Sequence, residues 1–255
     1  MAAFLSSSLN ALPGVWQGDA WAHASQPALA TGHAPLDAQL PGGGWPLGCM
    51  SELLLPPQAH PEWTLVMPAL AAHLAQGPGR AVLVTPPLEP FLPALQPLGL
   101  AADRLCCIHP SSPRADMAAA WACEQALRCR DVRAVLAWLP QVPAAVLRRL
   151  QLAAAQHRQL LWVMRPERSR AQASPAPLRL WLQPQGEELH VHVVKRRGPP
   201  LAQPVALPAR TPVLAAALQA QAQWRRQVQA AAWGMGGRTP QEVEDALACL
   251  ALATH

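Results

Sequence analysis

The residues best suited to chemistry in this sequence are basic side chains that could hold phosphate groups. One run is Lys195-Arg196-Arg197, and a looser group consists of Arg165, Arg168 and Arg170. Lysine and arginine bind a nucleic-acid backbone by neutralising phosphates and releasing counterions, which requires no reading of bases. These residues are therefore candidates for non-specific DNA contact. A charged face toward a protein partner and a plain solvated surface are the alternatives.

A second candidate group lies near the C-terminus and contains Trp224, Arg225, Arg226 and Trp233. Tryptophan and arginine are enriched where protein interfaces concentrate their binding energy. The segment around them, 213–232, is rich in Ala and Gln, so as a helix it has little large apolar surface to bury. Docking on a partner and packing onto the parent domain both explain this pattern, and we take the four residues as candidate partner-binding residues.

Metal and thiol chemistry is not indicated. His190 and His192 alternate on one face of an expected hairpin, but no third ligand lies near them in sequence. The six cysteines contain no C-x-x-C pair. We interpret them as small apolar residues of a reducing compartment, and we expect no metal and no cofactor.

Composition bounds the class of protein. The chain has 255 residues, 51% of them hydrophobic and 14% charged, with a formal net charge of +5. That apolar content is enough for a packed core. No apolar run reaches the ~18 residues that a membrane span needs, and the first residues lack the basic start of a signal peptide. We expect a cytoplasmic protein with no membrane contact.

Strand-like and helix-like patterns alternate along the chain. Continuous apolar runs predict strands at 50–55, 81–84, 104–108, 132–139 and 160–164, and helical spacing marks 61–75, 89–98, 115–128 and 142–156. This alternation predicts an α/β domain with a mostly parallel sheet flanked by helices. Segments 178–182 and 188–194 predict an antiparallel hairpin at the end of the sheet, and helices are expected at 213–232 and 241–253.

These patterns divide the chain into three parts. We expect an N-terminal arm over 1–30, the α/β domain over 31–205 and a helical C-terminal extension over 206–255.

Four stretches in this order resemble the RecA-type ATPase core. They run from Thr31-Gly32 to Glu52, over 87–106, over 124–136 and over 193–200. More narrowly, 40–55, 137–140 and 195–201 resemble the ImuA family. Those are RecA-like accessory proteins of translesion DNA synthesis, sometimes grouped with cell-division inhibitors of the SulA type. The resemblance implies a RecA-like fold for 31–205, and it places 165–177 where RecA carries a DNA-binding loop.

The phosphate loop that the resemblance implies does not fit its chemistry. Such a loop has the pattern G-x-x-x-x-G-K-S/T, in which backbone N–H groups and a lysine hold phosphates and a hydroxyl holds Mg²⁺. Here Leu55 stands for the first glycine, His60-Pro61 for the lysine region and Glu62 for the hydroxyl, while Pro56 and Pro57 remove N–H donors. We expect Glu62 to place a negative charge where a phosphate would lie.

Two further ATPase positions lack their acids. Trp138 stands where an acidic residue would order Mg²⁺, and Thr85 follows the strand whose end would carry the water-activating carboxylate. We therefore expect no ATPase activity, with weak nucleotide binding without hydrolysis as an alternative.

The resemblance implies a non-catalytic role in SOS-induced mutagenesis. The implied partners are an ImuB-like Y-family protein and an error-prone replicative-type polymerase, together with a contact to RecA. The alternatives are a RecA-type DNA-dependent ATPase or recombinase with a degenerate phosphate loop, and a SulA-like inhibitor of a cytoskeletal GTPase.

Overall fold

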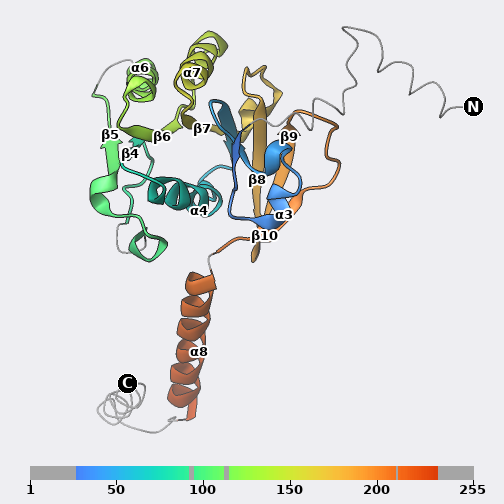
Figure 1. Cartoon of the computed structure of the whole chain (residues 1–255). Helices are drawn as coiled ribbons and strands as arrows, with labels where there is room; N and C mark the ends of the chain where they lie inside the picture. The colour runs from blue at the N-terminus through green and yellow to red at the C-terminus, as the bar shows by residue number, and fades with distance from the viewer. Residues whose placement is uncertain (1–26, 92–94, 112–114, 211, 235–255) are drawn as a thin grey trace, which may run out of the picture. The chain divides into compact units, whose positions relative to one another are not determined.

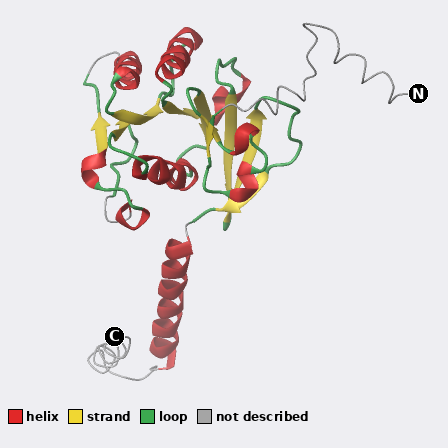
Figure 2. Cartoon of the chain, viewed as in Figure 1, coloured by secondary structure: helices red, strands yellow, loops and turns green. Residues whose placement is uncertain are grey.

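The computed structural model describes residues 27–91, 95–111, 115–210 and 212–234. The chain divides into two units, Met1–Ala209 and Arg210–His255, and each is described by itself. In the first unit a single large sheet has helices on both faces (Figures 1 and 2). In the second unit the described part is the helix α8 (Pro212–Gly234).

The sheet of the first unit has eight strands in the order β10-β9-β8-β3-β7-β6-β4-β5. The six strands from β8 to β5 are parallel, and β9 pairs antiparallel with both β8 and β10. Their bounds are β3 (Met50–Leu55), β4 (Arg80–Val84), β5 (Leu105–Ile108), β6 (Val132–Trp138), β7 (Leu160–Pro166), β8 (Leu178–Gln185), β9 (Glu188–Lys195) and β10 (Val205–Pro208). The predicted α/β class, mostly parallel sheet and antiparallel hairpin are confirmed; β10 was not predicted.

Side-chain alternation along the strands creates a core on each face of the sheet. The helix α4 (Glu62–Ala75) packs on the face that carries Leu53, Leu83 and Leu136. The helices α6 (Ala115–Arg128) and α7 (Ala144–His157) pack on the opposite face, and in Figure 1 they lie above the sheet while α4 lies below it. Both faces of the central strands are buried, which explains why those strands are almost continuously apolar.

The helix α4 continues through an internal proline because its freed carbonyl finds another partner. Pro68 has no N–H, so the carbonyl of Thr64 loses its helical donor. The ring Nε2 of His33 lies 3.3 Å from that carbonyl oxygen. Beside it, Gly32 has φ +84°, and a Cβ there would lie 2.5 Å from the Cβ of Pro68. Only glycine therefore fits where this turn packs against the helix.

The folded unit begins earlier than the sequence predicts. The short strand β1 (Ala28–Leu29) pairs with β2 (Trp45–Pro46), and Leu29 packs against the core. Two of the residues assigned to the N-terminal arm thus belong to the domain. The turn of α3 (Ala34–Asp37) and the 3₁₀ turn η1 (Pro41–Gly43) connect the two short strands.

One predicted helix, 89–98, is wrong at both of its described ends, and residues 92–94 lie outside the described residues. Residues 89–91 of the expected helix 89–98 are irregular, and its end is the 3₁₀ turn η2 (Gln96–Leu98). Pro90 and Pro97 remove backbone donors there, so proline overrides the apolar spacing. Two further 3₁₀ turns are η3 (Ala102–Arg104) and η4 (Glu167–Ala171). Within the described ranges no helix is long and apolar enough to cross a membrane.

Candidate functional site

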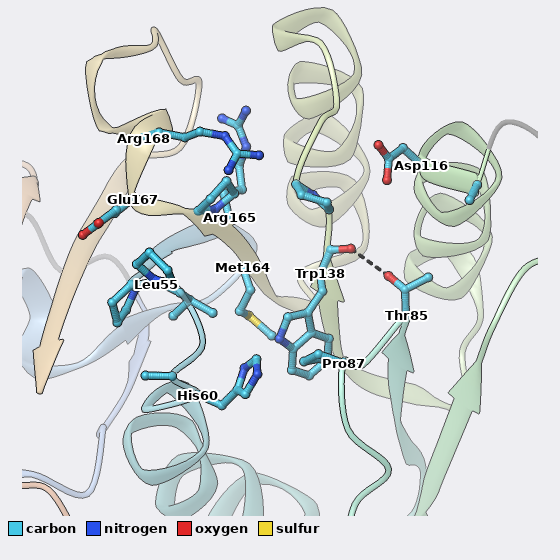
Figure 3. A pocket seen from close by; sticks show the side chains of 16 residues that line it. Leu55, His60, Thr85, Pro87, Asp116, Trp138, Met164, Arg165, Glu167 and Arg168 are labelled. Carbon is cyan, nitrogen blue, oxygen red and sulfur yellow. Dashed lines mark hydrogen bonds between the residues drawn. The ribbon is translucent and has the colours of Figure 1, made fainter.

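A cavity of about 630 Å³ opens at the carboxyl ends of the parallel strands. Its lining comes from the ends of β3, β6 and β7, the segments after β3 and β4, the start of α6, and η4. Ligands of open α/β sheets bind outside the carboxyl ends of the strands, so this cavity is the candidate functional site. Its wall is mainly apolar and includes Leu55, Pro57, Pro87, Trp138, Met164 and Pro166 (Figure 3).

The connection from β3 to α4 forms one side of the cavity. Pro56, Pro57 and Pro61 lie within this short connection, and Pro61 precedes the first residue of α4. A proline nitrogen carries no hydrogen, so the connection offers few donors to an anion at the start of the helix. Gln58 adopts φ 60°, a left-handed conformation that turns the chain between the prolines and His60.

Glu62 is fully buried beneath the cavity and does not line it. Its Oε1 accepts a hydrogen bond from the indole N–H of Trp138 at 3.0 Å and lies 3.2 Å from Nδ1 of His60. Its other oxygen has no hydrogen-bond partner among the described residues. Burial raises the pKa of this carboxyl, while the hydrogen bond from Trp138 and the nearby His60 oppose the rise. The prediction that Glu62 presents a charge at the phosphate position is therefore corrected.

Trp138 closes the floor of the cavity. Its ring lies 5.6 Å from that of Trp63 on α4, and only 8% of its surface is exposed. Its carbonyl oxygen lies 2.7 Å from the hydroxyl of Thr85, the bond drawn in Figure 3. Thr85 adopts φ 51°, which is unusual for a β-branched residue, and this hydrogen bond helps to hold the strained turn at the end of β4. Thr85, Trp138 and Glu62 thus form one connected group.

Arg165 belongs to a buried ion cluster rather than to an exposed basic patch. Its Nη1 lies 3.1 Å from Glu52 Oε1, and Nε of Arg179 lies 2.7 Å from Glu52 Oε2. Each of these three side chains is less than a tenth exposed. Buried charges must be paired, and β7 and β8 flank β3 on either side, so the sheet itself brings the two arginines to Glu52.

The other predicted basic residues do not form one uniform surface. Arg170 stacks over the ring of Trp181 at 4.1 Å, and Arg196 donates to the carbonyls of Gln39 and Pro199. Lys195 donates to the carbonyl of Ser174 and remains exposed. The exposed members of the predicted set are Arg168, Arg170, Lys195 and Arg197.

The four predicted partner-binding residues all lie on α8. Trp224, Arg225 and Arg226 are exposed on this helix, with 48% of Trp224 accessible. Trp233 belongs to the last turn of α8, and the expected helix 241–253 lies outside the described residues.

The two hairpin histidines, for which no metal site was expected, contact neighbouring side chains. His190 lies 2.9 Å from Glu188, and His192 stacks on Trp181 with ring centres 4.6 Å apart. Over the described ranges, no cluster of three or more His, Cys, Asp or Glu side chains is arranged to hold a metal.

The sequence analysis did not single out several residues in and beside the cavity. Asp116 and Glu167 line the cavity with Arg165 and Arg168, and Glu52 holds Arg165 in place. A signal for Glu52 exists, because one carboxylate inside the apolar run Met50–Leu55 must find a buried cation.

No protein-family model matches the chain, and no curated protein matches it significantly.

Proposed function

We propose that this chain is a non-catalytic, RecA-like accessory protein of SOS-induced translesion DNA synthesis, of the ImuA type. It acts through protein–protein contacts made by surfaces of the α/β domain and by α8. The proposal starts from the sequence resemblance, and the geometry of the cavity supports it.

The observation that carries the proposal is the contact between Glu62 and Trp138. In a RecA-type site the hydroxyl at the first position and the acid at the second would meet at one Mg²⁺. Here the two side chains meet directly at 3.0 Å, and Thr85, at the third ATPase position, bonds to Trp138. Three positions chosen from sequence alone therefore converge at the carboxyl edge of the sheet, as the resemblance requires.

The same residues do not fit a magnesium nucleotide. An indole ring is no metal ligand, and Glu62 is buried below the cavity, bonded to that indole. Three prolines remove N–H donors from the loop. The sole lysine, Lys195, is on β9, where its backbone lies opposite Arg179 of β8 and its ammonium group donates to the carbonyl of Ser174. The domain keeps the location of a nucleotide site without its chemistry, which supports a role in binding rather than hydrolysis.

The proposed partners are an ImuB-like Y-family protein, an error-prone replicative-type polymerase and, by the same resemblance, RecA. The exposed Trp224-Arg225-Arg226 of α8 has the composition of an interface hot spot. Non-specific DNA contact would use the exposed Arg168, Lys195 and Arg197.

Magnesium ATP is expected to leave the melting temperature of the full chain unchanged and to release no phosphate above background. A ligand present at a hundred times its Kd stabilises a protein by about 2.7 kcal/mol, a rise of roughly 5–10 °C for a domain of this size. Differential scanning fluorimetry and a phosphate-release assay measure both. A stabilised chain that also hydrolyses ATP would favour the recombinase-type ATPase instead.

Trp224→Ala in the full chain is expected to weaken binding of the ImuB-like partner by about 2 kcal/mol, or roughly thirtyfold, because truncating a tryptophan hot spot costs that much. Gln227→Ala, also exposed on α8, is the matched control and should have no effect. Biolayer interferometry with the immobilised partner measures both variants. Equal affinity of Trp224→Ala and Gln227→Ala would remove α8 from the proposal, and binding to a cell-division GTPase instead would favour the SulA-like alternative.

A further inference from the structure

The buried ion cluster beside the cavity contains more positive than negative charge. Glu52 is its one carboxylate, and Arg165 and Arg179 both pair with it. Arg179 uses its remaining nitrogens on the carbonyls of Arg170 and Ser169. Two guanidinium groups and one carboxylate leave a net charge of +1, and burial of such an excess is costly without a counter-charge.

Arg165 carries the unsatisfied part of this cluster. Its two terminal nitrogens donate to Glu52 and to Gln172, at 3.1 and 2.8 Å. Its Nε–H is buried and has no acceptor among the described residues. A buried donor without an acceptor costs about 1–3 kcal/mol, so an acceptor supplied by a ligand would relieve that cost. Arg165 also lines the cavity, so a ligand bound there would lie beside this guanidinium group.

The charges around the cavity define where an anion would lie. Exposed Arg168 is on the same side as Arg165, and Asp116 is on the opposite side, as Figure 3 shows. Glu167, next to Arg168, accepts a hydrogen bond from the indole of Trp181 at 3.2 Å. An anionic group would therefore be attracted toward Arg165 and Arg168 and repelled by Asp116, which fixes its orientation.

The rest of the lining selects an apolar body. Leu55, Trp138 and Met164 together with prolines provide most of the wall. A net charge of +1 in the cluster matches the single charge of one carboxylate better than the several charges of a triphosphate. A triphosphate would also need backbone N–H donors, and the proline-rich connection offers few of them. The cavity is an open cleft, and its volume of about 630 Å³ is within the usual range for ligand sites.

We propose that this cavity binds a peptide segment of a partner protein in which an aspartate or glutamate is adjacent to a large apolar side chain. The carboxylate faces Arg165 and Arg168, and the apolar side chain packs against Trp138 and Met164. This inference rests on the proposed function, because it gives the former nucleotide location a partner-binding role.

The test is a selection of random dodecapeptides displayed on phage against the full chain. Enriched peptides are expected to contain Asp or Glu next to Trp, Phe, Leu or Met. A fluorescein-labelled copy of the best peptide then gives a Kd by anisotropy. Asp→Asn or Glu→Gln in that peptide, and Arg168→Ala in the protein, should each weaken binding about tenfold or more, the usual loss for a charged hydrogen bond.

Two protein variants define the site. Ala59→Trp fills the cavity from its partly exposed rim and should abolish binding, while Arg148→Ala, an exposed arginine of α7 outside the lining, should leave the Kd unchanged. Melting curves show whether Ala59→Trp folds; if it does not, Arg168→Ala compared with Arg148→Ala decides alone. Failure to enrich acidic–apolar peptides, or equal affinity for Arg168→Ala and wild type, would overturn this inference.

A final arm separates this inference from the proposed function. Magnesium ATP is added to the peptide complex while phosphate release is followed. Displacement of the peptide with phosphate release contradicts both proposals, and absence of any peptide or ATP binding contradicts only the inference.

Discussion

Replacing Glu52 with alanine is expected to lower the free energy of unfolding by about 3–5 kcal/mol, because removal of one partner from a buried ion pair leaves uncompensated charge. In this case two guanidinium groups remain inside the sheet without their carboxylate. Arg165 is 3% exposed and Arg179 is 7% exposed, so most of each guanidinium group is kept out of water. Urea unfolding followed by circular dichroism measures the loss.

The matched control is Glu124→Ala. Glu124 also pairs with two arginines, Arg128 and Arg149, but those side chains are 53% and 56% exposed. They return to solvent when the carboxylate is removed, so the expected cost is about 1 kcal/mol or less. A loss for Glu52→Ala no larger than that for Glu124→Ala would show that the Glu52 cluster is solvated in solution.

A second comparison tests whether charge or packing is responsible. Glu52→Gln keeps the shape and one acceptor oxygen but removes the charge, so it should lose most of the stability that Glu52→Ala loses. Replacing all three groups together, as Glu52→Leu, Arg165→Met and Arg179→Met, should recover much of it, because a buried ionic triad can be replaced by apolar side chains of similar volume.

The strands were predictable from sequence because their signal is local. Parallel strands buried on both faces are apolar runs bounded by turns, and β4, β6 and β7 follow that rule. β10 has four residues and ends in Pro208, and it is recognised only through its pairing with β9. The two ends of the predicted helix 89–98 show the opposite case: residues 89–91 are irregular and 96–98 form a 3₁₀ turn, because local prolines outweigh the apolar spacing there.

The contacts of the site depend on register, which sequence patterns do not define. Glu52 is opposite Arg179 on β8, 127 residues away in sequence, and Arg165 is opposite Leu54 on β7. Arg165 is buried because β7 and β8 lie on either side of β3, and the sequence does not give this strand order. From the sequence alone, the burial of Arg165 therefore cannot be told from the exposure of its neighbour Arg168. The predicted basic group therefore mixed one buried structural arginine with solvated ones.

The sequence places Glu62 at the start of α4, as the structure does, but its burial beneath Trp138 was not predicted. The sequence indicates an acid at the start of α4, but not that Trp138 lies above it. The indole covers the carboxyl, and burial raises the pKa of Glu62, so the carboxyl is not presented to the cavity where the sequence argument expected it.

Replacing Trp138 with alanine is expected to lower the free energy of unfolding by about 3 kcal/mol. The change removes a large buried ring, its contact with Trp63 and the donor to Glu62. The loss is at the lower end of the range for buried aromatic residues, since the space that is created joins an open cavity that water can enter. Trp138→Phe keeps most of the apolar body and loses the N–H, so its cost should be about 1–2 kcal/mol.

The pH dependence of Trp138→Phe isolates the hydrogen bond. A carboxyl whose pKa is raised by folding contributes stability that is complete below its unfolded pKa and is lost as pH rises through the folded pKa. The Trp138 N–H opposes that loss, because it favours the charged form of Glu62. The cost of Trp138→Phe should therefore be smallest near about pH 4 and increase as the pH is raised.

Two backgrounds make this measurement decisive. In the Glu62→Gln background the side chain that accepts the indole hydrogen bond does not titrate. The loss in the free energy of unfolding caused by Trp138→Phe should therefore be the same at every pH. His60 is the other titratable group beside the carboxyl, at 3.2 Å, and repeating the series in His60→Asn removes its contribution. If the cost of Trp138→Phe is independent of pH in both the wild-type and His60→Asn backgrounds, the indole does not bond to Glu62 in solution. The convergence of the first two ATPase positions, on which the proposed function depends, would then lose its support.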